Sequence, residues 1–136
     1  MKIIVDTNVL VSAVFFGGVP GHILSAWRDA TIQIVTSPEI LEEYSIVLER
    51  LSSRYPTVDS SKVFSLVARH SECTISPSLP KPLCEDPDDD KFFACALAAG
   101  VKIIVSGDGH LLRQNGYCDI EVLRAADFVT KYLESD

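Results

Sequence analysis

Two identical tetrapeptides, Lys-Ile-Ile-Val, occupy residues 2–5 and 102–105 of the chain. Continuous β-branched apolar runs are typical of strands buried on both faces, as in parallel sheets. Further strand-like runs lie at 31–36, 73–76 and 120–123, separated by stretches with helical periodicity. This alternation predicts an α/β fold with a central, mainly parallel sheet of about five strands and helices on both faces.

The periodic stretches predict helices at 8–15, 21–29, 38–52, 59–71, 87–99, 109–114 and 124–134. The proline- and serine-rich segment 76–82 is interpreted as a loop and not as a linker between domains. A length of 136 residues fits one compact domain, so we expect a single domain over 1–136.

The net charge of −7 argues against a broad, tight nucleic-acid interface, because proteins that grip phosphates over a wide surface are usually basic. It is compatible with a cluster of acids that a cation partly neutralises. No apolar run approaches the roughly 20 residues that span a bilayer, and the first residues do not form a signal peptide. We therefore expect a cytoplasmic protein whose four cysteines are free thiols.

Aspartates follow both copies of the tetrapeptide, Asp6 directly and Asp108 after Ser106 and Gly107. In open α/β sheets, ligands bind outside the carboxyl ends of the strands. Either acid alone is open to a second interpretation as a helix N-cap. Two such acids after two matching strands favour a functional site at this edge of the sheet.

The predicted helix 38–52 carries one apolar stripe centred near Tyr44. Glu39, Glu42 and Glu49 fall on the opposite side of this helix and are interpreted as solvated. Glu43 falls at the margin of the stripe, where a carboxylate can reach from the edge of the core into a cleft. Helix geometry alone leaves Glu43 open between a surface acid and a site residue.

Five acids occur within the six residues 85–90. Asp86 before a proline is typical of an N-cap, and Asp88 and Asp89 then lie in the first helical turn, where the helix dipole favours negative charge. Asp90 shares a face with apolar residues of a helix that is apolar all round from 92 to 99, which predicts deep burial. An inward-facing acid requires a metal or a hydrogen-bond donor, so Asp90 is a candidate site residue.

The four acidic segments together resemble the PIN domain family of nucleases, and in particular the single-domain toxins of prokaryotic toxin–antitoxin pairs. The resemblance rests on Asp-Thr-Asn-Val-Leu at 6–10, Ser-Pro-Glu-Ile-Leu-Glu-Glu-Tyr at 37–44, Asp-Pro-Asp-Asp-Asp-Lys-Phe at 86–92 and Val-Ser-Gly-Asp-Gly-His-Leu-Leu at 105–112. It covers essentially the whole chain and implies a three-layer α/β/α PIN-like fold. The four acids that it implies are Asp6, Glu43, Asp90 and Asp108.

The activity implied is that of an endoribonuclease, hydrolysing RNA phosphodiester bonds by metal-activated water. Asp6, Asp90 and Asp108 would hold the metal, and Glu43 would complete the site or help to bind a second ion. Hard oxygen ligands select Mg²⁺ or Mn²⁺ over zinc, so one or two such ions are expected. The resemblance also implies an antitoxin protein as partner and a homodimer.

Two supporting residues follow from the same resemblance. Ser106 stands at a small hydroxyl position, and Asn8 at an amide position that orients the first acid. The family often has a further acid two residues after the fourth one, and this chain has His110 there, which weakens the case for a second metal. By proximity to the acidic segments, Lys91, Arg113 and Arg28 are the candidates for contacting RNA phosphates.

Other classes of protein share this alternating pattern. A phospho-acceptor signalling domain needs an acid pair after the first strand, whereas this chain has one acid there, Asp6. A haloacid-dehalogenase-type phosphatase needs a second aspartate where this chain has Asn8. The alternative that the sequence leaves open is a PIN-like module that binds RNA or protein without cutting. The four intact acids count against that alternative.

Overall fold

The two Lys-Ile-Ile-Val segments lie side by side at the centre of a five-stranded sheet in a computed structural model, which describes residues 1–134. They pair in parallel, with Ile4 beside Ile104 and Val5 beside Val105. The strands are β1 (Lys2–Val5), β2 (Gln33–Thr36), β3 (Glu72–Cys73), β4 (Ile103–Val105) and β5 (Glu121–Leu123), in the order β3-β2-β1-β4-β5. All four pairings are parallel.

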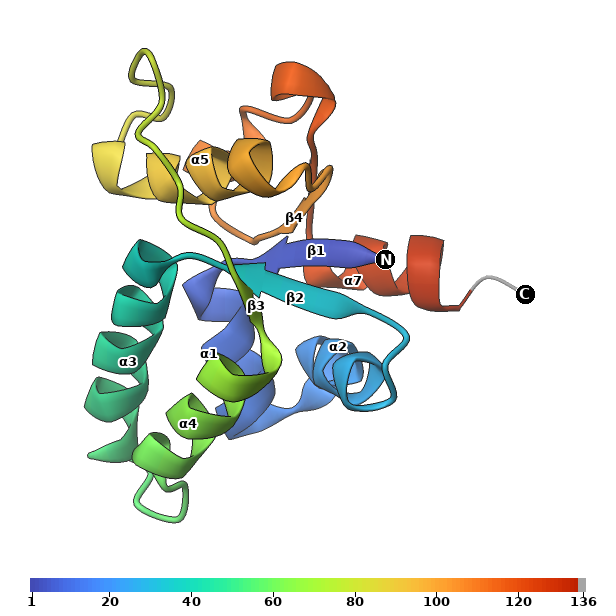
Figure 1. Ribbon diagram of the computed structural model, residues 1–136. Coiled ribbons are helices and arrows are strands. Elements are labelled where there is room, and N and C mark those ends of the chain that lie inside the picture. The colour runs from blue at the N-terminus through green and yellow to red at the C-terminus, as the bar shows by residue number, and fades with distance from the viewer. Residues whose placement is uncertain (135–136) are drawn as a thin grey trace.

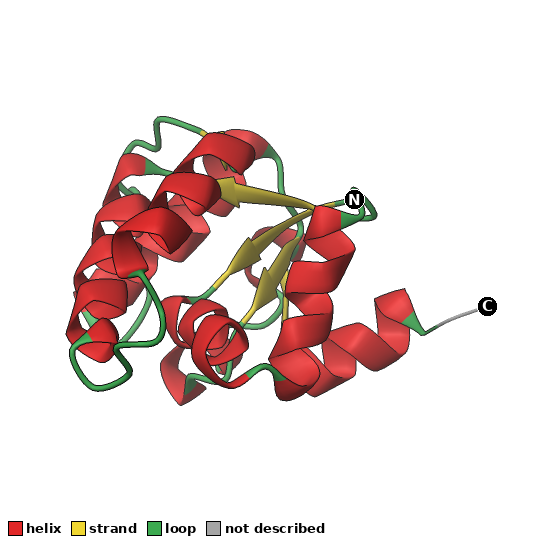
Figure 2. Ribbon diagram, turned by 90° about the horizontal axis from the view of Figure 1, so that it is seen from below, coloured by secondary structure: helices red, strands yellow, loops and turns green. Residues whose placement is uncertain are grey.

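Helices cover both faces of this sheet, with α5 above it and α1 to α4 below it in the view of Figure 1. The α-helices are α1 (Thr7–Phe16), α2 (Gly18–Arg28), α3 (Pro38–Ser52), α4 (Ser60–His70), α5 (Asp90–Ala99), α6 (Gly109–Leu112) and α7 (Ala125–Phe128). Shorter turns are η1 (Pro87–Asp89), η2 (Tyr117–Asp119) and the π-helical η3 (Val129–Leu133). Figure 2 shows the strands enclosed between helices. The predicted three-layer α/β/α fold is confirmed.

The largest differences from the sequence-based expectation concern the ends of elements. The strand expected from residue 31 begins at Gln33, because the amides of Thr31 and Ile32 still bond to Ala26 at the end of α2. The strand expected over 73–76 is only Glu72–Cys73, an exposed edge strand that gives way to a loop. The helix expected over 87–99 is two elements, the 3-10 turn η1 and then α5.

The core consists mainly of the strands and the helix faces directed at them. Ile3, Ile4, Ile34 and Ile104 are fully enclosed. The apolar stripe predicted for α3 is confirmed, since Ile40, Tyr44 and Leu48 are all buried. One expectation was wrong: α5 is not buried all round, because Leu97 is 40% exposed.

Helix α3 is fixed to the end of β1 at its centre and is capped at its start. The hydroxyl of Tyr44 donates a hydrogen bond to the carbonyl oxygen of Val5, the last residue of the strand. Ser37 caps the helix by accepting from the amide of Ile40, and Pro38 follows at the first helical position. These contacts place the acidic face of α3 beside Asp6.

Within residues 1–134, no single helix is long and apolar enough to cross a membrane. The pair α1 and α2 meets the criterion only when taken together, and the two helices are bent by 95° at their junction.

Candidate active site

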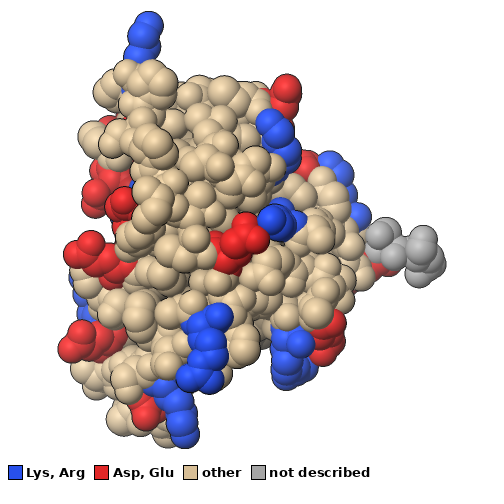
Figure 3. All heavy atoms as spheres, viewed as in Figure 1, with Lys and Arg blue, Asp and Glu red and all other residues tan. Residues whose placement is uncertain are grey.

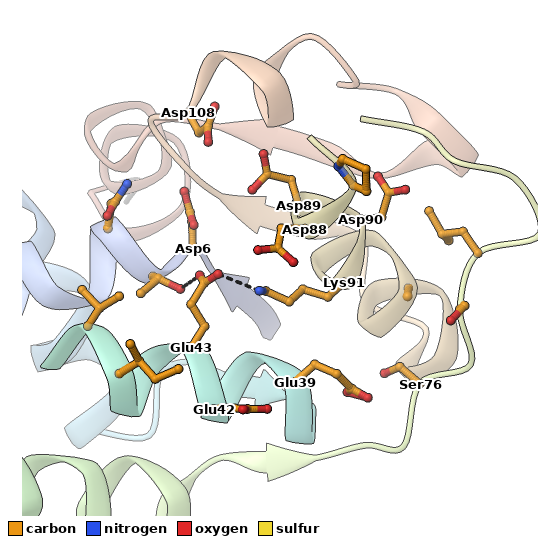
Figure 4. A pocket seen from close by; sticks show the side chains of 18 of the residues that line it. Asp6, Glu39, Glu42, Glu43, Ser76, Asp88, Asp89, Asp90, Lys91 and Asp108 are labelled. Carbon is orange, nitrogen blue, oxygen red and sulfur yellow. Dashed lines mark hydrogen bonds and ion pairs between the residues drawn. The ribbon is translucent and has the colours of Figure 1, made fainter. Parts of the chain in front are cut away.

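An acidic cavity of about 910 Å³ opens where the strands end and α3 and α5 begin. All four acids predicted as site residues line it, namely Asp6, Glu43, Asp90 and Asp108. The cavity wall also includes Glu39, Glu42, Asp88 and Asp89, and its basic residues are Arg50 and Lys91. Acidic side chains gather over the edge formed by α3 and the start of α5 (Figure 3), and their positions inside the cavity are shown in Figure 4.

Asp6 is the most buried acid of the cavity, with only 5% of its surface exposed. It occupies the N-cap position of α1, yet its side chain makes no capping hydrogen bond. Burial raises the pKa of Asp6 from its usual value of 3.8 to about 6, and the negative charges of Glu43 and Asp108 add to the rise. The hydrogen bond from Ser106 opposes this shift. Asp6 is therefore a buried acid whose negative charge is poorly compensated.

Ser106 connects Asp6 to Asp108 through its hydroxyl group. The hydroxyl donates to Oδ2 of Asp6 at 2.7 Å and accepts from the amide of Asp108 at 2.9 Å. Ser106 is fully buried. Asp108 in turn accepts from the amide of His110 at 2.8 Å, which caps the short helix α6. For Asp108 the capping and site interpretations are thus compatible, because one oxygen caps while the side chain lines the cavity.

Glu43 lies near Asp6 and is held by two partners (Figure 4). Its Oε2 accepts a hydrogen bond from the hydroxyl of Thr7, the first residue of α1. Its Oε1 is 2.6 Å from Nζ of Lys91, at the start of α5. The Lys91 side chain is 17% exposed and that of Glu43 27% exposed, so the ion pair is partly shielded from water. Unlike Asp6, Glu43 has a positive partner.

Asp89 and Asp90 are neighbours with different environments. Asp89 points toward the side of the cavity that holds Asp6 and Asp108, whereas Asp90 points away from it (Figure 4). Both oxygens of Asp90 accept from backbone amides, that of Cys84 at 2.7 Å and that of Leu83 at 3.1 Å. Asp90 thus satisfies two backbone amides of the loop before η1. Asp89, which the sequence placed outside the site, faces the cavity.

The pKa values of these two acids move in opposite directions. Burial raises the pKa of Asp89, and the charges of Asp108 and Asp86 raise it further. For Asp90, burial also raises the pKa, but the hydrogen bonds from Cys84 and Leu83 outweigh it and leave a net lowering. Asp86 itself caps η1 by accepting from the amide of Asp88, as predicted.

His110 lies beside Asp89 and Asp108 and offers an imidazole nitrogen. Its Nδ1 is 3.4 Å from Oδ2 of Asp89 and 3.7 Å from Oδ1 of Asp108. One ligand atom from each of these three residues lies within 4.8 Å of the others, a spacing compatible with a metal ion. On the outer side, Nε2 of His110 is 3.2 Å from Glu85, which also pairs with Arg113 at 2.8 Å.

The remaining predicted residues lie outside this network. Asn8 is exposed at the cavity wall, and the hydrogen bonds of residues 1–134 include none between Asn8 and Asp6. Arg28 ends α2, is 3.8 Å from Asp29, and lines a different cavity. Of the three basic candidates for RNA phosphates, Lys91 alone lines the acidic cavity.

The donor set fits a hard divalent cation. Asp89 in η1, Asp108 just before α6 and His110 present ligand atoms close to one another, and Asp6, just after β1, lines the same cavity. Hard oxygen ligands suit Mg²⁺ and Mn²⁺, and an imidazole nitrogen is tolerated better by Mn²⁺. The raised pKa of Asp6 has the origin expected of such a site, namely burial and like charges.

Comparison with known proteins assigns this chain to a family. A sequence model of the PIN domain matches residues 2–110. The chain belongs to the PIN domain family. PIN domains are in general metal-dependent nucleases. The uncharacterized protein MJ1680 of Methanocaldococcus jannaschii is 30% identical over 115 residues, covering 82% of this chain and 74% of the archaeal protein.

Two solved structures share the PIN fold of this chain. PAE2754 from Pyrobaculum aerophilum aligns with a TM-score of 0.65 over 99% of this chain and 91% of its own. VapBC2 from Rickettsia felis, solved bound to a DNA fragment from its promoter, aligns with a TM-score of 0.56 over 91% of this chain and 98% of the matched chain. Both are 14% identical in sequence, so the likeness concerns the fold.

Two contributors to this PIN site were not identified from the sequence. Thr7 follows Asp6 directly, and only the approach of α3 shows that its hydroxyl meets Glu43. Asp89 was assigned to the helix dipole, and only its direction in η1 places it in the cavity. The sequence shows only that Thr7 is adjacent to Asp6 and Asp89 to Asp90. Local periodicity does not tell which of two adjacent side chains faces the cavity.

Proposed function

We propose that this PIN domain is a metal-dependent endoribonuclease that hydrolyses RNA phosphodiester bonds. The observation that carries the proposal is the uncompensated cluster around Asp6, at the carboxyl ends of the paired strands β1 and β4. A buried carboxylate surrounded by other carboxylates is stabilised by a cation. In the proposed site, Asp6, Asp108 and Asp89 hold Mg²⁺ or Mn²⁺, and Asp90 shapes the adjoining loop.

A divalent cation bound there would supply activation of a water and stabilisation of the negative charge on the departing oxygen. The chain supplies the geometry. Ser106 fixes the orientation of Asp6 and the backbone at Asp108, so both carboxylates are held before substrate arrives. Because Asp6 is buried, its side chain has little rotational freedom, and a bound cation would be held in a fixed position.

RNA is the proposed substrate because the family resemblance implies it. The charge distribution of the chain restricts how RNA can bind. A chain with net charge −7 holds a polyanion only where basic groups compensate, and Lys91 and Arg50 are the basic residues of this cavity. A small contact of this kind suits an unpaired loop or single strand better than a long duplex.

A toxin role with an antitoxin partner is part of the proposal. It is supported by the likeness to the VapBC2 chain in fold and by the single-domain toxin motifs in the sequence. A homodimer is proposed on the same grounds. The four free cysteines, Cys73, Cys84, Cys95 and Cys118, suit the reducing cytoplasm.

The proposal is tested by incubating the purified chain with single-stranded RNA, structured RNA and DNA in Mg²⁺, in Mn²⁺ and in EDTA. We expect metal-dependent cleavage of RNA that falls at least about a hundredfold in Asp6→Asn. Asp127→Asn, an exposed aspartate on α7, is the matched control and should cut like the wild type. Equal background cutting by all three proteins would refute the nuclease and favour an RNA- or protein-binding module.

A further inference from the structure

The acids of the cavity differ in whether a basic side chain pairs with them. Asp6, Asp89 and Asp108 have no lysine or arginine paired to them among the ion pairs of residues 1–134. Glu43, by contrast, is bound to the ammonium group of Lys91 at 2.6 Å. Figure 4 shows the lysine extending across the cavity floor from α5 to meet Glu43.

We propose that the ammonium group of Lys91 occupies the place of a second cation, so that this PIN site binds one divalent ion instead of two. This rests on the proposed metal-dependent function and specifies its stoichiometry. Lys91 is then a positioning residue: it neutralises Glu43 and keeps a permanent positive charge in the cavity.

The contacts of Glu43 argue for this assignment. Its two oxygens are both engaged, one by Thr7 and the other by Lys91. A divalent ion binding Glu43 would either share the carboxylate with the ammonium of Lys91, close to another positive charge, or displace that ammonium. Displacing the lysine would leave an ammonium group partly shielded from water and next to a new double positive charge, which is unfavourable.

The position of Lys91 is fixed by its surroundings and not only by its partner. Its side chain is 17% exposed, so most of its aliphatic part is covered by protein. The ammonium lies 5.8 Å from the centre of the Phe92 ring. In the proposal, the ammonium held on Glu43 takes the role that a second divalent ion would have in a two-ion site.

The test counts bound Mn²⁺ in the full-length chain without RNA, by electron paramagnetic resonance of the free ion during titration. We expect one Mn²⁺ in the wild type, one in Lys91→Arg and two in Lys91→Met, where Glu43 becomes available. Lys62→Met, an exposed lysine on α4, is the matched control and should bind one. Thermal unfolding followed by circular dichroism confirms that each variant is folded.

Two results would overturn the proposal: two ions of similar affinity in the wild type, or a count that stays at one in folded Lys91→Met. The count in the wild type needs no variant. It can therefore refute the proposal even if Lys91→Met does not fold. If Lys91 merely ties α3 to α5, Lys91→Met lowers the melting temperature and leaves the count unchanged.

Kinetics add a readout on the same variants. With RNA, Lys91→Met should lower kcat about a hundredfold at low Mn²⁺, and high Mn²⁺ should restore part of the loss. RNA cleavage by a wild type that binds two ions would refute the proposal for Lys91 but support the nuclease function. One bound ion without any RNA cleavage would support the proposal for Lys91 but refute the nuclease function.

Discussion

The acids of this cavity form two groups that differ in what compensates their charge. Glu43 and Asp90 are compensated by the chain itself, the first by Lys91 and the second by two backbone amides. Asp6 and Asp89 face other acids, and the pKa of each is raised. Lining the cavity therefore does not by itself make an acid a metal ligand. The uncompensated acids are the ones that gain from a cation.

The strongest expected consequence concerns Asp6 and pH in the absence of divalent ions. Its folded-state pKa, about 6, lies above its usual value of 3.8. The neutral form therefore stabilises the fold below about pH 4, and this contribution is lost as pH rises through 6. At about 1.4 kcal/mol per pKa unit, the loss is about 3 kcal/mol.

Urea unfolding of the wild type and Asp6→Asn between pH 4 and pH 7.5 measures this effect. The difference in stability between the two proteins should change by about 2.5 kcal/mol across that range, in favour of the variant at high pH, because part of the unfolded-state titration is already complete at pH 4. Asp127→Asn should follow the wild type at every pH. A pH-independent difference between wild type and Asp6→Asn would mean that Asp6 titrates normally and is not an uncompensated acid.

A smaller effect separates Asp89 from Asp90. If the compensated acids are not ligands, Asp89→Asn should weaken Mn²⁺ binding by about 10- to 100-fold, or about 1.4–2.7 kcal/mol. Asp90→Asn should leave Mn²⁺ affinity within a few-fold and instead destabilise the fold, because an asparagine offers one acceptor to two amides.

Calorimetric titration with Mn²⁺ and thermal unfolding of both variants distinguish these outcomes. Loss of Mn²⁺ affinity in Asp90→Asn with little change in Asp89→Asn would restore the assignment that the sequence motif favours. It would also show that Asp90 leaves the loop amides when a cation binds.

The fold was predictable because burial sets a clear signal in the sequence. The paired strands at 2–5 and 102–105 lie together as their matching apolar runs predict, and the stripe centred on Tyr44 is buried on α3. Element ends were less predictable, since they depend on hydrogen bonds between segments. The amide of Thr31, which still bonds to α2, is one example.

The acids at 86–90 show why the site was harder to read. Helical periodicity assumes about 100° per residue from the first turn, but Pro87–Asp89 forms a 3-10 turn with about 120° per residue. The angular order of Asp89 and Asp90 is therefore shifted relative to a continuous helix. The amides that Asp90 meets belong to an irregular loop, which no periodic pattern describes.

Removing the Ser106 hydroxyl should make the ionised form of Asp6, one of the acids without a positive partner, still less favourable. Ser106→Ala removes the donor to Asp6, so the pKa of Asp6 should rise further above its present value of about 6. It also leaves the amide of Asp108 without its side-chain acceptor. Losing hydrogen bonds to a buried charged group costs about 1.5 kcal/mol at pH 7.5.

This predicted cost should shrink as Asp6 becomes protonated, so urea unfolding of Ser106→Ala at pH 4.5 and pH 7.5 provides the check. Ser106→Thr keeps the hydroxyl and serves as the comparison for packing. An equal cost at both pH values would indicate that the serine acts by packing alone.

The smallest effect is expected beside a compensated acid, at Thr7. Thr7→Val removes the hydroxyl that donates to Glu43 but keeps the shape of a buried side chain. Because Lys91 still neutralises Glu43, the free energy of unfolding should fall by only about 0.5–1 kcal/mol, and the Mn²⁺ count should stay at one. Thr7→Ser, which retains the hydroxyl, is the control for the hydrogen bond. A loss in Thr7→Val as large as that in Ser106→Ala would mean that the lysine does not compensate Glu43, and the two groups of acids would no longer differ in kind.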